Sequence, residues 1–247
     1  DTRNNWISSL NQIGFPISSF RGFTVEGIFQ SQAEVDAWGQ EGAQVGGLKF
    51  ADLNGDGQIT EDGDVGIIGS PHPDFTLGVN LSLGYKRFDL TAFFLAVVGN
   101  EISNQTRAFT HLRQFNGNIT QEVLENAWSE DNTDSNIPAL NAVDNSSNFQ
   151  STYYIEDGSY LRAKQVQLGY SVPANAIKGV SNLRFYIQGQ NLFTITGYSG
   201  ADPAISNVNQ GNGGRAGAGS ANDQWTGFDH GMYPASMIVM FGVNASF

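Results

Sequence analysis

Apolar and polar residues alternate strictly along residues 76–85, where the sequence is TLGVNLSLGY. One face of this stretch carries apolar side chains, namely Leu77, Val79, Leu81, Leu83 and Tyr85. A repeat of two residues is typical of a β-strand with one apolar face. Lys86 and Arg87 interrupt the pattern, which resumes along residues 88–98, FDLTAFFLAVV. We therefore predict a β-hairpin with its turn at these two residues.

The same alternation returns three times nearer the carboxyl terminus. Residues 165–172 and 183–188 are two predicted strands, separated by a short segment that contains Pro173. Residues 237–247, MIVMFGVNASF, form a third predicted strand. Its apolar face consists of Met237, Val239, Phe241, Val243, Ala245 and Phe247. The chain thus has five predicted strands.

The connections between these strands alternate between short and long. They are short after Tyr85 and Val172 but long over residues 99–158 and 193–234. Outer-membrane barrels show this asymmetry, with tight periplasmic turns and long extracellular loops. The predicted fold class is therefore all-β, an antiparallel transmembrane β-barrel whose extracellular loops carry short helices. The aromatic residues expected at the periplasmic rim are Tyr85, Phe88, Tyr170, Phe185 and Phe247.

A soluble β-sandwich is the alternative, because its strands also alternate and its apolar face packs on a second sheet. The uneven connections, the aromatic residues at one end and the terminal Phe247 favour the barrel. The longest apolar run, residues 90–98, is about half of the roughly 20 residues that a membrane helix requires. Helical membrane spans are therefore excluded.

Five strands, or six if residues 17–29 contribute one, are too few to enclose a useful lumen, and bacterial barrels normally have an even number. We therefore expect the carboxy-terminal portion of a larger plugged barrel, with the remaining wall upstream. The absence of an initial Met agrees with this expectation. Residues 1–75 would be mainly extracellular loop, and residues 76–247 would be strands and loops of the same barrel domain.

Two short helices are predicted within the long loops. Ser31 followed by Glu34 indicates a capping box at the start of SQAEVDAW, and residues 120–129 favour a second helix. The tryptophans of these segments, Trp38 and Trp128, would either hold the helices to their support or contact a ligand. In the last long loop, the candidates for contact with substrate or partner are Trp225, Phe228 and Tyr233.

The segment DLNGDGQITEDGD has the spacing of a calcium-binding loop. Its candidate ligands are Asp52, Asn54, Asp56, Gln58, Asp62 and Asp64. The closing position is irregular, because Gly63 stands where the last carboxylate belongs. Ca²⁺ would make the loop rigid, and it is the one cofactor that we consider. The alternative is a loop whose Asp and Asn side chains accept hydrogen bonds from local amides.

Composition excludes several other functions. The formal net charge is −12 with only 12 Lys and Arg residues, so nucleic acid is not an expected partner. There is no cysteine, which excludes disulfides and thiolate chemistry. The three histidines have no ligand spacing, and no GxSxG, HExxH or phosphate-binding glycine loop occurs. We therefore expect that the chain is not an enzyme. The glycine-rich residues 211–220 predict a mobile loop.

Five segments resemble the carboxy-terminal region of the SusC/RagA family of TonB-dependent outer-membrane transporters. They are GLKFADLNGDGQIT, IIGSPHPDFTLGVNLSLGYKRFDLTAFF, IEDGSYLRAKQVQLGYSVP, LRFYIQGQNLFTITGYSGADPAI and YPASMIVMFGVNASF. The match runs in order over residues 27–247. It departs from the family at Ala204, where an acidic residue usually follows the Asp-Pro pair.

The resemblance implies a barrel subunit that imports oligosaccharides or peptides across the outer membrane of a Bacteroidota-type bacterium. It implies a SusD-like surface lipoprotein as the partner at the outer face, and membrane lipid around the barrel. TonB would act through an amino-terminal region that also contains the plug and lies outside this chain. The alternative function is a secreted, calcium-stabilised β-sandwich adhesin or glycan-binding module.

Overall fold

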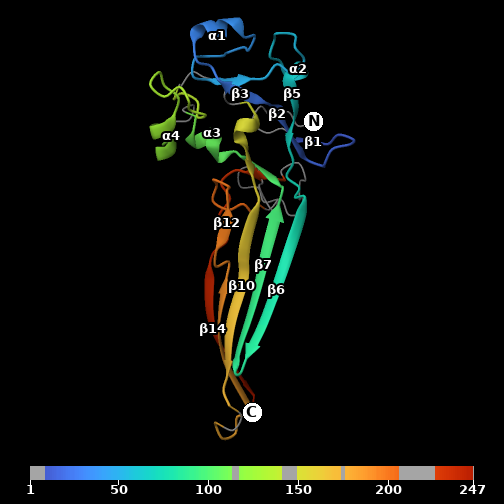
Figure 1. The fold of residues 1–247 in the computed structure, drawn as a ribbon, viewed down its shortest axis with the longest axis vertical. Coiled ribbons are helices and arrows are strands. Elements are labelled where there is room, and N and C mark those ends of the chain that lie inside the picture. Colours follow the sequence, from blue (N-terminus) through green and yellow to red (C-terminus); the bar gives the residue numbers. More distant parts are fainter. Residues whose placement is uncertain (1–8, 113–116, 141–148, 174–175, 206–225, 247) are drawn as a thin grey trace, which may run out of the picture. The chain divides into compact units, whose positions relative to one another are not determined.

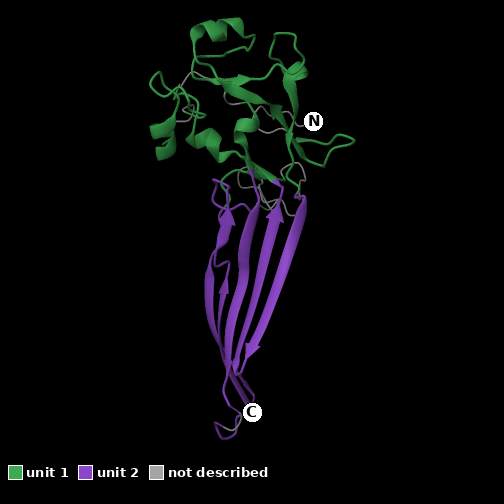
Figure 2. Cartoon of the chain, viewed as in Figure 1, with its two compact units in different colours: residues 1–72, 101–156, 204–232 green, residues 73–100, 157–203, 233–247 purple. Residues whose placement is uncertain are grey.

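The computed structural model describes residues 9–112, 117–140, 149–173, 176–205 and 226–246. The chain divides into two compact units, which are described separately (Figure 2). The loop unit consists of residues 1–72, 101–156 and 204–232, and the sheet unit consists of residues 73–100, 157–203 and 233–247. Among the described residues, no helix has the length and apolar character needed to cross a membrane.

The sheet unit is built on five long antiparallel strands (Figure 1). They are β6 (Phe75–Tyr85), β7 (Phe88–Val98), β10 (Tyr160–Ser171), β11 (Asn182–Gln190) and β14 (Ile238–Ser246). Their order in the sheet is β14-β11-β10-β7-β6. Short connections join β6 to β7 and β10 to β11, whereas long connections precede β10 and β14. These are the five strands that the alternation predicts, each with slightly different ends.

The first predicted hairpin is confirmed by its register. Tyr85 pairs with Phe88, which leaves Lys86 and Arg87 as the two turn residues. Lys86 has a φ of 56°, in the left-handed region that two-residue hairpin turns require. The turn therefore forms where the polar interruption of the pattern predicts it.

A bulge interrupts the pairing of β10 with β7. The register of β10 against β7 shifts between Ala163 and Gln165. Opposite this shift, Asn191 has a φ of 48° and donates its backbone N–H to the Lys164 carbonyl oxygen. The pairing then resumes at β12 (Thr194–Thr196), which lies against the beginning of β10. The other edge of β10 thus pairs with β11 over residues 165–171 and with β12 over residues 160–162.

The loop unit contains three small sheets. The first has β1 (Ser9–Leu10), β2 (Ser19–Phe23) and β5 (Val65–Gly69), and the second pairs β3 (Val25–Ile28) with β4 (Leu48–Phe50). The third has the order β13 (Phe228–Asp229), β8 (Glu101–Asn104) and β9 (Ile155–Asp157). Residues 17–29, considered as a sixth barrel strand, therefore form β2 and β3 of the loop unit instead of joining the long sheet.

The short helices of the loop unit are α1 (Gln32–Ala37), α2 (Glu61–Asp64), α3 (Thr106–Thr110) and α4 (Gln121–Asn126), with a 3₁₀ turn at Thr152–Tyr154. The two predicted helices are confirmed as α1 and α4. The Ser31 hydroxyl accepts the Glu34 N–H, as in a capping box. Glu34 does not complete the box at Ser31 but accepts the N–H of Gln30.

A stacked pair of aromatic rings lies at the centre of the loop unit. The Phe23 and Phe50 rings are 4.7 Å apart and inclined by 11°. They belong to a buried cluster with Ile28 and Leu48, on which Trp128 packs. This cluster holds β3 and β4 to the rest of the unit by burial of apolar surface.

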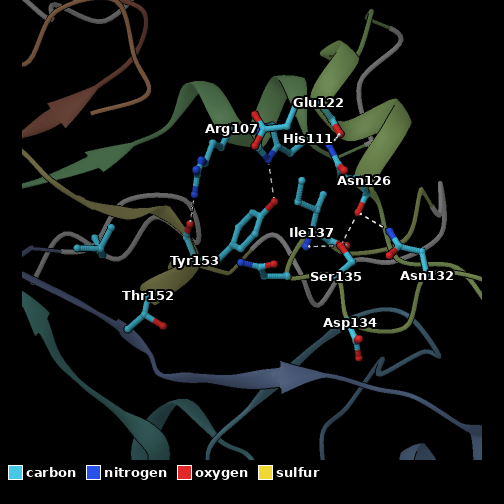
Figure 3. Close-up of a pocket in the computed structure, with 12 residues that line it drawn as sticks. Arg107, His111, Glu122, Asn126, Asn132, Asp134, Ser135, Ile137, Thr152 and Tyr153 are labelled. Carbon is cyan, nitrogen blue, oxygen red and sulfur yellow. Dashed lines mark hydrogen bonds between the residues drawn. The ribbon is translucent and has the colours of Figure 1, made fainter. Parts of the chain in front are cut away.

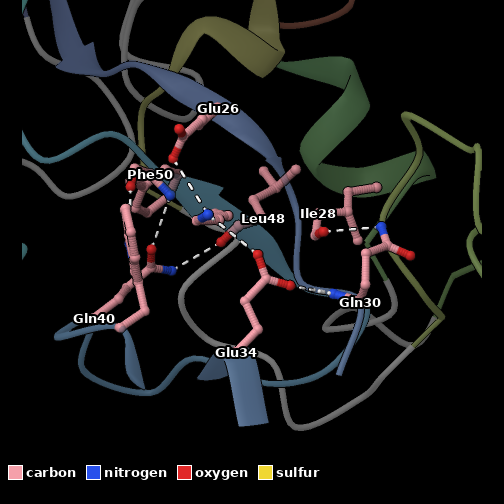
Figure 4. A network of polar contacts seen from close by, with 9 residues as sticks. Glu26, Ile28, Gln30, Glu34, Gln40, Leu48 and Phe50 are labelled. Carbon is pink, nitrogen blue, oxygen red and sulfur yellow. Dashed lines mark hydrogen bonds and ion pairs between the residues drawn. The ribbon is translucent and has the colours of Figure 1, made fainter. Parts of the chain in front are cut away.

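Side-chain contacts attach α1 to the β3–β4 pair (Figure 4). Lys49 forms ion pairs with Glu26 at 3.4 Å and with Glu34 at 3.1 Å. The Gln40 amide donates to the Leu48 carbonyl and accepts the Phe50 N–H. The hydrogen bond from the Gln30 backbone N–H holds the pKa of Glu34 below its usual value, and the nearby Lys49 ammonium adds to this effect. The helix is therefore fixed from both of its ends.

Trp38 and Trp128, the tryptophans of the two predicted helical segments, take part in this packing. The Trp38 indole N–H donates to the Phe50 carbonyl at 3.1 Å, and the Lys49 ammonium lies 4.0 Å from its ring centroid. The Trp128 indole N–H donates to the Gln30 side chain at 2.9 Å. These contacts support the expectation that each tryptophan holds a helical segment to its support.

Candidate functional site: the two faces of the long sheet and the loop unit

One face of the long sheet is apolar and exposed. Its side chains include Leu77, Leu81, Leu83, Leu168, Phe185, Ile187, Val239, Phe241 and Val243, all of which are exposed large hydrophobic residues. The face also has an apolar hollow of about 460 Å³ between Phe88, Tyr170, Phe185 and Phe241. Apolar surface of this extent is unusual on a monomeric soluble protein and marks a contact with membrane or protein.

An aromatic row crosses this face at one end of the strands. Tyr85 pairs with Phe88, Phe88 with Tyr170, and Tyr170 with Phe185, so one residue of each of four neighbouring strands contributes. The Phe88 and Tyr170 rings are 4.9 Å apart. The strand pairing therefore brings together four of the five aromatic residues expected at a barrel rim. The fifth, Phe247, lies outside the described residues.

The opposite face of the same strands carries most of their polar groups, and an ion pair spans it near the aromatic row. Farther from the row, this face also carries Phe93, Leu95 and Val97 of β7. Arg184 on β11 donates from Nε to Asp89 Oδ1 at 3.0 Å and from Nη2 to Asp89 Oδ2 at 2.5 Å. Gly169 of the intervening β10 pairs with both Asp89 and Tyr186. A Cβ on Gly169 would be 2.3 Å from Arg184 and 2.5 Å from Asp89. Because Gly169 has no side chain, the ion pair can occupy the space above it.

A second ion pair fixes the loop that follows β12. Arg162 on β10 pairs with Asp202 at 2.5 Å, and the Arg162 side chain is 3% exposed. Arg162 also donates to the Thr194 hydroxyl, and Asp202 accepts the N–H of Ala235 just before β14. Asp202, the first residue of the Asp-Pro pair noted in the sequence, thus takes part in contacts that link β10, β12 and the segment just before β14.

The calcium-like loop binds its own backbone amides. Asp52 accepts the N–H groups of Gly55 at 2.7 Å and Gly57 at 2.8 Å, and the Gly57 bond is the main reason that the Asp52 pKa is lowered. Asn54 accepts the N–H of Asp56, whose own carboxylate accepts the N–H of Gln58.

Asp64 closes this loop from the inside. It is fully buried and accepts the N–H of Leu53 and of Thr60, both at 2.8 Å. Asp62 lies beside it within α2. Within the part of the chain that the structure describes, no group of three or more His, Cys, Asp or Glu side chains could hold a metal ion. Calcium binding by this loop stays a prediction from the spacing.

The three aromatic candidates of the last long loop have different surroundings. Phe228 is fully buried, with its ring edge-to-face at 5.0 Å from Phe20. Tyr233 belongs to the sheet unit and is 89% exposed. Trp225 lies outside the described residues. Ligand contact remains a prediction for Tyr233, whereas in this conformation Phe228 packs inside the loop unit.

The loop unit also has a polar pocket of about 550 Å³, which no sequence motif indicates (Figure 3). Its lining comes from α3, α4, the segment 132–137 and the 3₁₀ turn. The residues are Arg107, His111, Glu122, Asn126, Asn132, Asp134, Ser135, Asn136, Ile137, Thr152, Tyr153 and Ile155. They are spread over nearly fifty positions without a motif, so only the fold brings them together.

A buried histidine and a partly buried tyrosine lie at one side of this pocket. His111 Nδ1 is 2.8 Å from the Tyr153 hydroxyl. Burial lowers the pKa of His111, and Arg107 adds to this, while Glu122 and Glu156 act in the other direction. Burial also raises the pKa of Tyr153. Both groups are therefore neutral near pH 7.

Comparison with known proteins gives related sequences but no matching family model. TonB-dependent receptor P3 of Formosa agariphila is 37% identical over 238 residues, covering 95% of this chain and 22% of the receptor. Receptor P26 of the same organism is 35% identical over 241 residues. TonB-dependent receptor SusC of Bacteroides thetaiotaomicron is 28% identical over 204 residues, covering 80% of this chain and 17% of that receptor.

The solved structures agree with these relatives. The RagAB peptide transporter matches 99% of this chain and 24% of the solved chain, with a TM-score of 0.71 and 25% identity. The RagAB peptide importer in its "open-open" state matches 96% of this chain with a TM-score of 0.68. The chain spans about a fifth to a quarter of the length of the proteins that it matches.

Proposed function

We propose that the chain is part of a TonB-dependent receptor of the SusC/RagA type and that it forms part of the wall of an outer-membrane β-barrel that imports nutrients. The complete receptor is a transporter and not an enzyme. It lies in the outer membrane of a Bacteroidota-type bacterium and takes up oligosaccharides or peptides.

The observation that carries this proposal is the two-faced long sheet. The apolar face is exposed over five strands, while the other face carries polar groups such as Asn80, Gln167 and the Asp89–Arg184 pair. In a membrane barrel the first face would meet lipid and the second would line the lumen. A sandwich would cover its apolar face with a second sheet, so this exposure disfavours the alternative of a secreted adhesin.

The aromatic row indicates which end of the strands faces the periplasm. Interfacial girdles of aromatic residues border the apolar band of such barrels. The row from Tyr85 to Phe185 lies at the end with the short connections, which are the periplasmic turns of this architecture. The loop unit would then be extracellular, where a SusD-like lipoprotein is the proposed partner. TonB would supply energy through the amino-terminal region.

The direct test of the function uses the full-length receptor in its own bacterium. Affinity purification of the receptor from outer membranes is expected to recover a surface lipoprotein in stoichiometric amount. Deletion of the receptor gene is expected to abolish growth on one class of oligosaccharide or peptide, and plasmid-borne receptor should restore it. Recovery of the protein in the culture medium, with no growth defect on any such nutrient, would contradict the proposal.

A further inference from the structure

The apolar hollow of the long sheet is a feature that a barrel wall by itself does not require. Its volume of about 460 Å³ lies within the roughly 300–1,000 Å³ that is usual for small-molecule sites. We propose that this hollow, together with the basic hairpin turn at its end, binds one phospholipid whose headgroup carries a net negative charge. The inference rests on the proposed barrel wall and names a lipid class that the wall binds at a fixed position.

The hollow spans two rows of side chains on the apolar face. The lining side chains are Phe88, Tyr170, Phe185 and Val243 in the first row and Leu168, Ile187 and Phe241 in the next. Lipid tails are as apolar as these strands, so an acyl chain gains in the hollow through close packing and not through removal from water. Selectivity for one kind of lipid must therefore come from its headgroup.

The turn between β6 and β7 places positive charge at the end of this face. Lys86 and Arg87 are its two residues, and the Lys86 ammonium lies 5.2 Å from the centroid of the Tyr85 ring. Tyr85 pairs with Phe88, which lines the hollow. The Arg87 carbonyl oxygen accepts the N–H of Ser171, and this bond joins the turn to the end of β10. A phosphate held by the turn would therefore lie next to the hollow.

The charges at this end of the sheet favour a headgroup with net negative charge. Lys86, Arg87 and Lys178 form no ion pair within the described part of the chain. Among the described residues at the aromatic-row end of the five strands, the one carboxylate is Asp89, and Arg184 binds both of its oxygens. The ammonium of a zwitterionic headgroup would find no carboxylate to bind here. An anionic headgroup is attracted by the same side chains without that cost.

Two tyrosines of the aromatic row add hydrogen-bond donors. Tyr85 is 71% exposed, and Tyr170 lines the hollow. A tyrosine at a membrane surface keeps its ring in the apolar layer and its hydroxyl at the level of the headgroups. Phosphate and ester oxygens of a lipid can accept from such hydroxyls. The basic turn, the tyrosines and the hollow thus match the phosphate, the ester groups and an acyl chain of one phospholipid.

Native mass spectrometry of the full-length receptor tests this site. The receptor is purified in detergent, stripped of lipid and titrated with phosphatidylglycerol or with phosphatidylcholine of the same acyl chains. We expect one phosphatidylglycerol to be retained at concentrations that leave phosphatidylcholine unbound. Lys86→Gln with Arg87→Gln should weaken this retention roughly fivefold for each cation removed, the usual contribution of a Lys or Arg at an anionic lipid surface. Lys164→Gln, in β10 but outside the lining, should not change it.

A substitution within the hollow gives an independent readout. Val243→Phe enlarges a side chain of the lining and should weaken retention of phosphatidylglycerol severalfold. Val79→Phe is the matched control, since Val79 is exposed on the same apolar face but does not line the hollow. Gel mobility before and after heating shows that each variant is folded.

Three results would overturn the inference. They are equal retention of the two lipids, no retained lipid, and folded Lys86–Arg87 and Val243 variants that retain phosphatidylglycerol like wild type. Each would leave the proposed import function standing, because recovery of the receptor from outer membranes with a surface lipoprotein tests that function separately.

Discussion

Asp89 and Arg184 form a two-pronged ion pair although they are 95 positions apart and belong to strands that do not touch each other. The pair crosses the strand between them directly above Gly169. Two parallel hydrogen bonds between guanidinium and carboxylate fix both side chains in orientation as well as distance. The pair therefore joins three neighbouring strands on the polar face of the sheet.

Gly169→Ala is expected to disrupt this ion pair, because the new Cβ would overlap Arg184 and Asp89. We predict a loss of about 1–3 kcal/mol of unfolding free energy, as is usual for overpacking. Urea unfolding of the full-length receptor in detergent micelles, followed by band shift in gel electrophoresis, measures it. Gly84→Ala is the control, since Gly84 also pairs with Asp89 but a Cβ there meets nothing within 4 Å. Equal midpoints for both variants would contradict this account.

Arginine substitutions distinguish the two faces of β10. Val166→Arg places a charge on the apolar face and is expected to destabilise the barrel by about 2–4 kcal/mol near the membrane centre. Gln165→Arg, one position away on the polar face, should have a small effect. Folding into lipid vesicles over a range of urea concentrations gives both values. A larger loss for Gln165→Arg would reverse the assignment of the faces.

His111 is expected to make the loop unit sensitive to acid. Its pKa is lowered in the folded protein by burial, so on acidification the unfolded segment takes up the proton first. Stability is therefore complete above the ordinary pKa of about 6.5 and falls as the pH drops below it. Hydrogen exchange of α3 and the 3₁₀ turn should accelerate between pH 7.5 and pH 5.5. His111→Gln should remove most of this dependence, and an unchanged profile in that variant would assign it to other groups.

Asp64→Asn is expected to loosen the calcium-like loop. The replacement leaves one oxygen for the two backbone N–H groups of Leu53 and Thr60, so one buried donor loses its partner at a cost of about 1–3 kcal/mol. Amide exchange over residues 52–64 should increase. Asp62→Asn, within the same helix but exposed, is the control, and equal exchange in the two variants would show that Asp64 does not close the loop.

Calcium is a separate prediction for the same loop. If the spacing of its oxygen ligands is functional, millimolar calcium should slow exchange of residues 52–64 relative to EGTA. Asp56→Ala should remove this difference. Identical exchange with and without calcium would leave the hydrogen bonds to local amides as the complete account of the loop.

Alternation along the sequence was sufficient to predict the five long strands, because apolar residues recur at every second position of each strand. It also placed Asp89 and Arg184 on the polar face, but pairing register is a long-range property, so their contact was not predictable. The two capped helices were predictable because helix capping is local. Ser31 and Glu34, for example, lie within one helical turn.

The loop unit shows where such reasoning ends. Phe228 has the sequence context of an exposed loop aromatic, but the pairing of β13 with β8 and the ring of Phe20 bury it. The pocket depends on residues from four separate segments, and none of them stands in a recognisable motif. Only the three-dimensional packing distinguishes Asn136 or Glu122 from other polar loop residues.

The accessibility of alternate positions on β10 tests the membrane assignment most directly. The chain has no cysteine, so single cysteines at residues 165, 166, 167 and 168 of a cysteine-free full-length receptor can carry nitroxide labels in lipid bilayers. We predict that labels at 166 and 168 collide preferentially with oxygen dissolved in lipid, and that labels at 165 and 167 collide with a water-soluble nickel reagent. Four labels that are equally accessible to the water-soluble reagent, or an alternation in the opposite phase, would contradict the proposal that this sheet is a barrel wall.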